Sequence, residues 1–513
     1  MEEKYIAAID LGSAKFAVTV ARISGEDIQI VYYKESPSDG IRNSFVFNPM
    51  KAREKLAVAI SDAEKELNIK ILQVCVGLPR YPVTQEIATG RFERTEPNSC
   101  ITMEEIEMLK SMALDAYPLN DPKSDELYGA VAQSFSTDEY FQLVEQDVIG
   151  TISRELEGNF KVFIGKQHAV NTIEVVFNQL HIAIARMYFL PDAIAKAVLT
   201  QEEMSSGVAL VDFGGGVTSV SIYHGNIMRY YGAIPFGGKV ITSDIRTECS
   251  VSESLAENIK RGFGSCMPSK LQNLSEKTLQ ITYDDRPDIE MRVSYLAEII
   301  GERTKEIVDA ILYLIQESGF ADRLQNGLVV TGGGALLMGL SYLIKERSGY
   351  NVKIGYPRHF FCAEGCSGIY EPSATAAMGM ILAAKGDHLP DCVDMPDFVP
   401  DDFGMEIIQP GSETDAPQEE VAAVETPETV EAPVEAAPAR QEPQWDPGFA
   451  EGEQGTLIQK EAFGEAQPRQ KKRSPRPSRE KPKREPSTIN IVWKKWSGKI
   501  TKKFNEIYDD VTQ

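Results

Sequence analysis

The sequence is best interpreted outward from residues 207–223, which are Gly-Val-Ala-Leu-Val-Asp-Phe-Gly-Gly-Gly-Val-Thr-Ser-Val-Ser-Ile-Tyr. Branched apolar residues, an interruption by Asp212 and three glycines, and renewed alternation from residue 217 predict strand, tight turn and strand. Glycine amides approach an anion closely because no Cβ intervenes, and a threonine adds a hydroxyl donor. The predicted phosphate contacts are Gly214, Gly215, Gly216 and Thr218. Asp212 suits Mg²⁺ held through water, although an ordinary glycine-rich hairpin explains the pattern equally well.

The same pattern recurs at residues 5–20, which run from an apolar strand through an aspartate, a glycine and a hydroxyl residue into an alternating strand. Two such hairpins in one chain predict two related lobes that clamp phosphates between them. The candidate residues in this second hairpin are Asp10, Gly12, Ser13 and Lys15.

A third element, residues 327–340, is predicted to be a strand that ends in Gly332, Gly333 and Gly334 and runs into a helix. Such a turn lets a flat ring lie against backbone. Between the hairpins, Glu257 and Lys260 are three residues apart on one helical face, which suits ribose hydroxyls or a simple surface ion pair. Taken alone, the pair is more typical of a solvent-exposed helix face than of a ribose contact.

In order and spacing these motifs resemble the actin-like ATPase superfamily, which includes actin, heat-shock chaperones and sugar kinases. Within it, residues 210–216, 234–244 and 329–336 look like signature segments of the FtsA family of bacterial cell-division proteins, and the likeness spans residues 1–385. The resemblance implies a two-lobed, ribonuclease-H-like α/β fold that binds ATP with Mg²⁺. It assigns Asp10, Gly12, Ser13 and residues 212–218 to phosphate and metal, the glycine triplet 332–334 to adenosine, and Glu257 with Lys260 to ribose.

Composition sets further bounds. The formal net charge of −23 argues against nucleic acid as the partner of the whole chain. Seven cysteines without a CxxC pair predict reduced thiols in the cytosol. We expect no signal peptide, and no apolar run reaches the ~18–20 residues that span a bilayer. Any membrane contact is therefore expected to be peripheral.

The predicted domain order follows from changes in pattern along the chain. The N-terminal part is predicted to contain several strands, a helix over residues 49–67 and a capping box at Thr102. A further helix is predicted over residues 171–188. The predicted segments are a first lobe (1A) at 1–83, an inserted small α+β subdomain of the SHS2 kind (1C) at 84–166, connecting helices of the first lobe at 167–206, a second lobe (2A/2B) with its closing helix at 207–385, an acidic disordered linker at 386–468, a basic segment at 469–486 and an amphipathic helix at 487–513.

Leu190 opens the helix that joins the lobes. Heat-shock chaperones carry Glu-Pro at this point, where the polar residue helps to orient the attacking water, and leucine offers water neither donor nor acceptor. We therefore expect weak or absent ATP hydrolysis. Asp192 is a possible substitute, but a carboxylate favoured by the helix dipole is the preferred interpretation.

The C-terminal part changes character twice. Residues 391–466 hold 20 acidic and two basic residues in Pro- and Ala-rich runs that cannot bury enough apolar surface to fold. Residues 469–484 then hold nine basic residues and one acid. Such a run is usually a solvated segment, and a nucleic-acid-binding tail is the alternative. The segment that follows decides between these interpretations and a membrane-binding one.

That following segment predicts an interfacial membrane helix. Large apolar residues recur every three or four positions and form one stripe: Ile489, Trp493, Trp496, Ile500, Phe504, Ile507 and Val511. Lysines flank it at Lys494, Lys495, Lys499, Lys502 and Lys503. Tryptophan favours the headgroup region and lysines reach towards anionic lipids, so membrane binding is preferred over a protein-binding helix.

Taken together, these features and the FtsA resemblance predict a scaffold at the division site. It would self-assemble on the cytoplasmic face of the inner membrane, bind the C-terminal peptide of FtsZ at subdomain 2B and later division proteins through 1C, and bind no nucleic acid. The alternatives are a kinase of the same fold, which needs an acceptor pocket with a base, a PilM-like pilus-assembly relative, which lacks the basic amphipathic ending, and an MreB-like filament, whose insert falls elsewhere.

Overall fold

The structure is a computed structural model that describes residues 3–271, 276–281, 289–358 and 360–394. The predicted start of the acidic linker at residue 386 is wrong, because residues 386–394 belong to the fold: Cys392 is buried and Val393–Asp394 form a short strand beside Lys70–Ile71. The predicted linker from residue 395 on, the basic segment and the amphipathic helix lie outside the described residues. No helix within the described ranges is long and apolar enough to cross a membrane.

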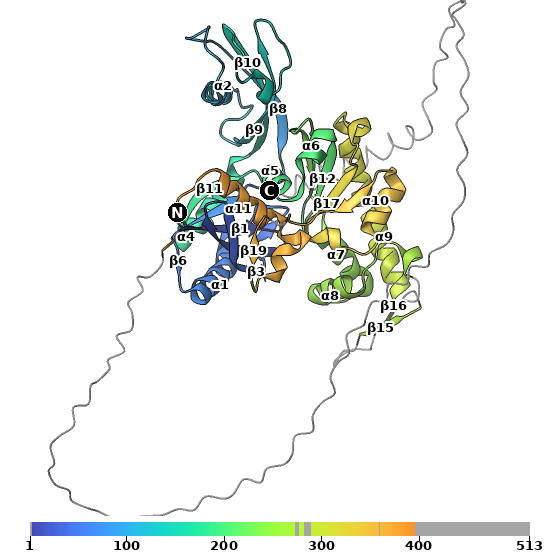
Figure 1. Ribbon diagram of the computed structural model, residues 1–513. Helices are drawn as coiled ribbons and strands as arrows, with labels where there is room; N and C mark the ends of the chain where they lie inside the picture. Colours follow the sequence, from blue (N-terminus) through green and yellow to red (C-terminus); the bar gives the residue numbers. More distant parts are fainter. Residues whose placement is uncertain (1–2, 272–275, 282–288, 359, 395–513) are drawn as a thin grey trace, which may run out of the picture. The chain divides into compact units, whose positions relative to one another are not determined.

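The first large sheet has the strand order β11-β7-β1-β2-β3-β19 (Figure 1). Its strands are β1 (Glu3–Leu11), β2 (Lys15–Ser24), β3 (Asp27–Pro37), β7 (Gln73–Gly77), β11 (Ala183–Tyr188) and β19 (Cys362–Ala363). β1, β2 and β3 form an antiparallel meander, and β7 and β11 are then added parallel to β1. Residues 6–10 of β1 are all buried, so both faces of the sheet are covered.

The second large sheet has the same plan, with the order β14-β13-β12-β17-β18. Its strands are β12 (Val208–Phe213), β13 (Thr218–His224), β14 (Ile227–Ile234), β17 (Leu328–Thr331) and β18 (Val352–Ile354). Again an antiparallel meander is followed by two parallel strands, which require helical crossovers between them. The prediction of two related lobes, each opened by a glycine-turn hairpin, is confirmed.

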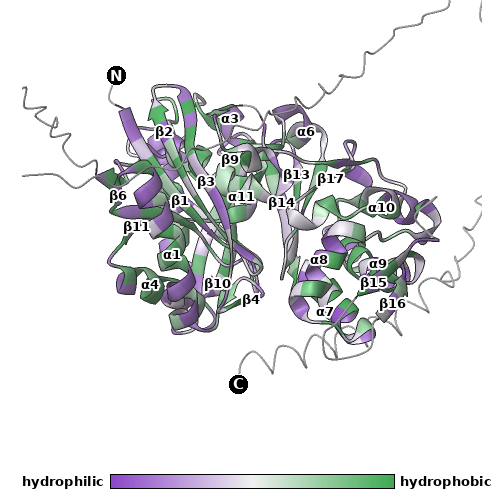
Figure 2. Ribbon diagram, turned by 90° about the horizontal axis from the view of Figure 1, so that it is seen from below, coloured by the Kyte–Doolittle hydropathy of each residue, from purple (hydrophilic) through white to green (hydrophobic). Residues whose placement is uncertain are grey.

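Helices cover the first sheet on both sides, with α1 (Pro49–Leu67) and α4 (Gln167–Leu180) on one side and α11 (Thr375–Gly386) on the other (Figures 1 and 2). The predicted bounds of α1 are confirmed. Asn48 caps its first turn by accepting from the amide of Lys51, proline occupies the first position, and Asn68 ends it in the left-handed region.

The predicted helix over residues 171–188 is wrong in its second half. α4 ends at Leu180, His181 adopts a left-handed φ of 58°, and residues 183–188 form the edge strand β11 beside β7. The apolar spacing in this stretch fits either structure, and the sheet edge favours the strand because its backbone groups find partners there.

Residues 84–166, the predicted insertion, form a separate sheet of order β8-β10-β9. Its elements are β8 (Thr84–Glu93), α2 (Met103–Asp115), β9 (Asp125–Thr137), α3 (Glu145–Val148) and β10 (Glu155–Lys166). α2 begins with the predicted capping box of Thr102 and Glu105. The insert has its own apolar core, which includes Leu109, Phe135, Leu156 and Phe160.

One buried cation holds this insert together. The side chain of Arg94 is 0% exposed and makes a fork-shaped pair with Glu105, at 2.8 Å from Nε and 2.9 Å from Nη2. Its nitrogens also donate to the carbonyl oxygens of Ser99, Cys100 and Ser153. Arg94 thereby connects the end of β8, the start of α2 and the start of β10.

Arg94→Met is expected to destabilise the insert by about 3–5 kcal/mol, because Glu105 and three carbonyls lose their partner. Hydrogen exchange over residues 84–166 measures the loss. Arg91→Met is the matched control: Arg91 lies three residues earlier, on β8, pairs with Glu155 and is 61% exposed, so little or no loss of stability is expected. Equal exchange in the two variants would contradict the role given to Arg94.

The pair also predicts a pH dependence. The hydrogen bonds from Arg94 hold the pKa of Glu105 below its ordinary value. The stabilisation is therefore fully present above the ordinary pKa and is lost as pH falls through the lowered one. Arg94→Met should flatten this part of the acid unfolding profile.

The remaining elements complete the two lobes. The second lobe carries α7 (Gly238–Cys249), α8 (Glu253–Phe263), the hairpin β15 (Thr278–Ile281) and β16 (Ile289–Arg292), α9 (Val293–Glu317) and α10 (Leu340–Ser348), with short 3-10 turns at Pro268–Lys270, Ala321–Arg323, Gly333–Leu336, Ser367–Tyr370 and Pro372–Ala374. α5 (Leu190–Val198) and α6 (Gln201–Ser206) connect the lobes, and the short pairs are β4 (Ile41–Arg42) with β5 (Phe45–Val46) and β6 (Lys70–Ile71) with β20 (Val393–Asp394).

The predicted closing helix is confirmed as α11, which packs against α5 near the centre of the fold. Small residues make the contact close: a Cβ at Gly379 would overlap the backbone of Ala193. Most of the residues of α11 are buried, and its hydrophobic sequence can be followed in Figure 2.

Candidate functional site

The structure brings the two predicted phosphate turns into contact. β1 and β12 occupy equivalent places in the two sheets, so Asp10 and Asp212 lie at equivalent strand ends. A Cβ added at Gly215 would stand 2.6 Å from Cβ of Ala14, and one added at Gly216 would stand 2.6 Å from Oγ of Ser13. The turns approach this closely because these two positions are glycine.

The second turn is fixed by hydrogen bonds to the start of α7. The carbonyl oxygens of the turn accept from the first amides of the helix, with Gly238 N 3.0 Å from Gly214 O and Lys239 N 2.8 Å from Gly215 O. The amide of Gly214 donates to Val217 O at 3.0 Å. Among the described residues, the amides of Gly215 and Gly216 have no acceptor, which leaves them as anion donors.

Thr218 was predicted to donate its hydroxyl to phosphate, and the structure directs that hydroxyl to a protein carbonyl. Its side chain is fully buried, and its hydroxyl donates to Phe236 O at 2.8 Å. The threonine therefore connects β13 to the segment before α7 and does not offer its proton to an anion. The sequence pattern gave the residue type but not the direction of the hydroxyl.

Both strand-end carboxylates are buried, Asp10 at 7% and Asp212 at 5% exposure. Burial raises the pKa of Asp10, and the nearby charges of Arg80 and Lys15 oppose the rise only in part. Asp212 forms a buried ion pair with Arg80. A divalent cation bound between the turns would therefore lie beside two buried carboxylates.

Arg80 was not among the predicted site residues. It follows β7, the parallel neighbour of β1, so its position at the same sheet edge as Asp10 could have been inferred. The missing information was that the 78–83 segment turns towards the second lobe. There Tyr231 of β14 donates its hydroxyl to Arg80 O at 2.7 Å.

The other residues of the first turn are tied within the first lobe and to the segment before α11. Ser13 Oγ accepts from the amide of Ser44 at 3.0 Å. Lys15 pairs with Glu35, which also accepts from Ser373 Oγ at 3.0 Å. Burial acts to raise the pKa of Glu35, but Lys15 and the hydroxyl donors outweigh it and lower the pKa.

The third motif meets the second. Gly332 has a φ of 84°, and a Cβ there would overlap Oδ1 of Asp212, while one at Gly334 would overlap the ring of Phe213. At Gly333 the nearest atom would be Ser373 Cβ, at 3.8 Å. The expected direct entry into a helix is wrong, because a 3-10 turn at Gly333–Leu336 comes first and α10 begins at Leu340.

Glu257 and Lys260 form the expected pair, at 2.7 Å, but not a solvated face. Lys260 is 13% exposed and also donates to Gly238 O at 2.9 Å and Thr242 Oγ1 at 2.8 Å. Burial lowers its pKa, against the opposing charge of Glu257. Because Gly238 N donates to Gly214 O, a chain of hydrogen bonds joins this pair to the phosphate turn.

Leu190 packs into the core and is 3% exposed. A Cβ at Gly77 would lie 2.5 Å from its Cδ1, so the leucine fills the space over the end of β7. Asp192 pairs with Lys196 at 3.0 Å and is 44% exposed, which agrees with the helix-terminal interpretation. Leu190→Glu, an obvious variant for restoring a polar group, would bury a charge here and is expected to destabilise the protein.

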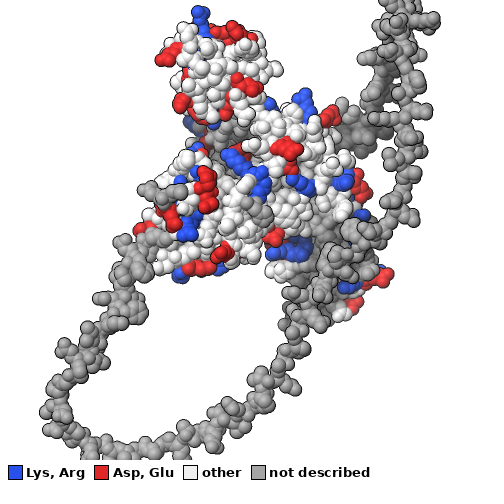
Figure 3. Space-filling model, in the orientation of Figure 1, with Lys and Arg blue, Asp and Glu red and all other residues white. Residues whose placement is uncertain are grey.

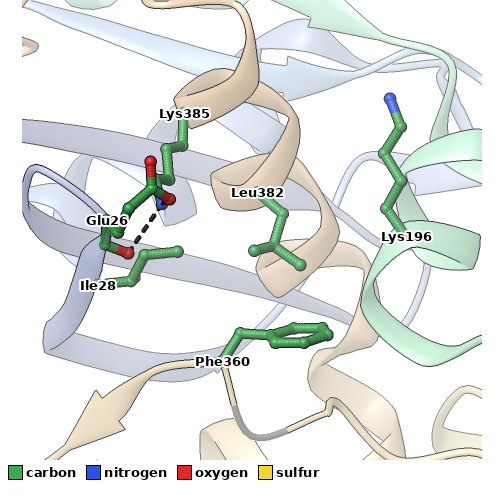
Figure 4. A pocket seen from close by; sticks show the side chains of 6 residues that line it. All are labelled: Glu26, Ile28, Lys196, Phe360, Leu382 and Lys385. Carbon is green, nitrogen blue, oxygen red and sulfur yellow. Dashed lines mark hydrogen bonds and ion pairs between the residues drawn. The ribbon is translucent and has the colours of Figure 1, made fainter. Parts of the chain in front are cut away.

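A cavity of about 400 Å³ lies elsewhere, between the β2–β3 turn, α5 and α11 (Figure 4). It is lined by Glu26, Ile28, Lys196, Phe360, Leu382 and Lys385, and Lys385 is paired with Glu26 at 2.6 Å. None of the predicted motif residues lines it. Within the described residues, no group of three or more His, Cys, Asp or Glu side chains is arranged to hold a metal by itself.

Known proteins share both the sequence pattern and the fold. The family model described as "Cell division protein FtsA" matches residues 209–379. The cell division protein FtsA of Neisseria meningitidis serogroup B is 27% identical over 390 residues, which cover 75% of this chain and 91% of that protein. FtsA of Escherichia coli K12 is 24% identical over 396 residues, covering 76% and 92%.

Among solved structures, the PilM-PilN type IV pilus biogenesis complex matches with a TM-score of 0.51 and 15% identity, covering 74% of this chain and 98% of that one. This likeness concerns the fold alone, which is the predicted two-lobed actin-like fold. The family model over residues 209–379 and these relatives agree with the FtsA resemblance predicted from the sequence: over most of their length, this chain is similar to cell division proteins named FtsA.

Proposed function

We propose that this protein is an ATP-binding scaffold of cell division that self-assembles on the cytoplasmic face of the membrane, at the division site, and tethers FtsZ there. The observation that carries the proposal is the meeting of two glycine turns at the ends of β1 and β12, beside Asp10 and Asp212. Equivalent turns from two lobes form a clamp for a polyphosphate.

The residues present fit a nucleotide with its metal. Cβ atoms at Gly215 and Gly216 would fill the contact between the turns, and the amides there have no protein acceptor among the described residues. Asp10 and Asp212 would hold Mg²⁺ through water, and the cation would supply charge that neutralises phosphate oxygens. Gly333, the least obstructed glycine of its triplet, suits an approaching purine, and Glu257 suits a ribose hydroxyl.

Slow turnover belongs to the same proposal. Helix α5 begins with Leu190, whose side chain packs against Gly77, and Asp192 forms an ion pair with Lys196. Neither offers a base that orients water, so nucleotide would act mainly through binding and assembly.

Two surfaces and the tail would supply the partners. The insert exposes large apolar side chains, which are Ile87, Met103, Met108, Met112, Tyr140, Phe141, Ile149 and Ile152. These suit contacts with neighbouring copies or with later division proteins. The outer part of the second lobe, 2B, would dock the FtsZ peptide. Basic and acidic side chains are interspersed over the face in Figure 3, whereas residues 469–503 hold the basic run that would meet anionic lipid.

The test is recruitment of FtsZ to anionic vesicles by the purified full-length chain. FtsZ is expected to sediment with vesicles only when the chain and anionic lipid are both present. Neutral vesicles are the control, because they remove the electrostatic part of the attachment. FtsZ that stays in the supernatant while the chain itself is bound would overturn the tethering role.

A further inference from the structure

Arg80 is a buried cation placed between the two lobes, and no predicted motif contains it. It is 9% exposed, and its Nη1 donates to Oδ2 of Asp212. Its Nη2 lies 3.7 Å from the point where a Cβ of Gly214 would stand. Its Nε is buried and has no hydrogen-bond partner in the described part of the chain.

The backbone of Arg80 is fixed from both lobes. Its amide donates to Ser44 Oγ at 3.0 Å, and its carbonyl accepts from the hydroxyl of Tyr231 at 2.7 Å. The amide of Ser44 in turn donates to Ser13 Oγ. Arg80 is therefore connected to the first phosphate turn through Ser44 and to the second through Asp212.

A purely structural ion pair explains only part of this arrangement. Two buried carboxylates, Asp10 and Asp212, stand near the single guanidinium, and an unpaired buried donor is costly. A guanidinium carries five N–H donors in a fixed fork that matches phosphate oxygens. Beside Gly214, where the phosphate turn begins, an anion would satisfy the donors that Asp212 leaves unused.

We propose that Arg80 is a phosphate-binding residue of the nucleotide site, and that it shares with Mg²⁺ the neutralisation of the phosphates and of Asp212. This inference rests on the proposed nucleotide binding. Its consequence is that ATP binding by this protein depends less on Mg²⁺ than in a site where the metal is the only cation beside the phosphates.

Titration of the full-length chain with ATP, in Mg²⁺ and in EDTA, tests the proposal. Arg80→Gln should weaken ATP binding about 10- to 100-fold in Mg²⁺, as expected for charge-assisted hydrogen bonds, and abolish the binding that the wild type keeps in EDTA. Arg80→Lys keeps the positive charge without the forked guanidinium, and its ATP affinity should lie between those of the wild type and Arg80→Gln. Adenosine, which carries no phosphate, should bind all three proteins equally.

A second pair of variants separates phosphate contact from support of Asp212. Asp212→Asn and the double variant Arg80→Gln/Asp212→Asn both lack the buried carboxylate, so a difference between them cannot arise from support of Asp212 by Arg80. In EDTA, Asp212→Asn should still bind ATP and the double variant should not. Equal binding by these two proteins, or no ATP binding by Asp212→Asn in EDTA, would show that Arg80 acts only through Asp212.

The outcomes distinguish the two proposals. A wild-type chain that binds no ATP even with Mg²⁺ overturns the proposed nucleotide site as a whole. A wild type that binds ATP only with Mg²⁺, or an Arg80→Gln protein with unchanged ATP affinity, overturns the role of Arg80 and leaves the nucleotide site standing.

Discussion

Asp212→Ala is expected to abolish measurable binding of Mg-ATP, a loss of about 100-fold or more. Truncating one member of a buried, hydrogen-bonded charge pair costs about 2–5 kcal/mol, and here the cation site loses a carboxylate as well. Asp212 also lies against Gly332, so the change reaches the turn predicted to hold adenosine. Calorimetric titration with Mg-ATP measures the effect.

The control for this variant must separate binding from folding, because Arg80 would be left buried without its partner. Asp212→Asn keeps the side-chain volume and should lose part of the Mg-ATP affinity, because Arg80 still meets the phosphates, with a smaller decrease in melting temperature. Asp62→Ala removes a carboxylate that is 41% exposed and paired with Lys34, and should leave ATP binding unchanged. Unaltered affinity in Asp212→Ala would refute the interpretation of the turn at residues 212–218.

Trp493→Glu together with Trp496→Glu is expected to release the protein from anionic vesicles. Both tryptophans lie on the apolar stripe of the predicted helix, and the double change removes two large apolar groups, each contributing about 1.5–3 kcal/mol when buried. It also puts two charges on the face that enters the headgroup region. Sedimentation with vesicles measures the loss, and the cytosolic fraction of a tagged chain measures it in cells.

A charge variant provides the comparison for this experiment. Glutamine in place of Lys494, Lys495, Lys499, Lys502 and Lys503 should weaken binding chiefly at low salt and on anionic lipid, because only the screened electrostatic contribution is changed. Trp445, in the acidic stretch, should keep the emission of a tryptophan in water when vesicles are added. If the double-glutamate protein sediments like the wild type, the segment binds a protein partner instead.

Local features of this fold could be predicted because short-range contacts determine them. Helix α1 has its predicted bounds because Asn48, Pro49 and Asn68 satisfy its ends within one turn. The capping box of α2 needs only Thr102 and Glu105, three residues apart. The glycine turns of β1–β2 and β12–β13 could be recognised for the same reason, and their repetition indicated two related lobes.

The edge of the first sheet shows where local patterns were insufficient. Residues 183–188 carry apolar spacing that fits a helix, yet they form β11 because β7, about 110 residues earlier in the chain, offers backbone partners. Local patterns also could not predict which hydrogen-bond partner an individual side chain would choose. Thr218 donates to Phe236, and Lys260 to Gly238, because folding brings those carbonyls within hydrogen-bonding distance.

The sequence by itself indicated candidate residues for phosphate, metal and nucleoside, since backbone freedom at glycine and the charge of aspartate are properties of single positions. It also carries the resemblance to the FtsA family and the apolar stripe from which the amphipathic helix is predicted. Only the tertiary structure decided that Ser13 meets Gly216, that Leu190 fills the space at Gly77, and that Arg80 lies against Asp212. Those contacts join residues 113 to 203 positions apart, and their distances are set by packing within the first lobe and between the two lobes, which no local pattern encodes.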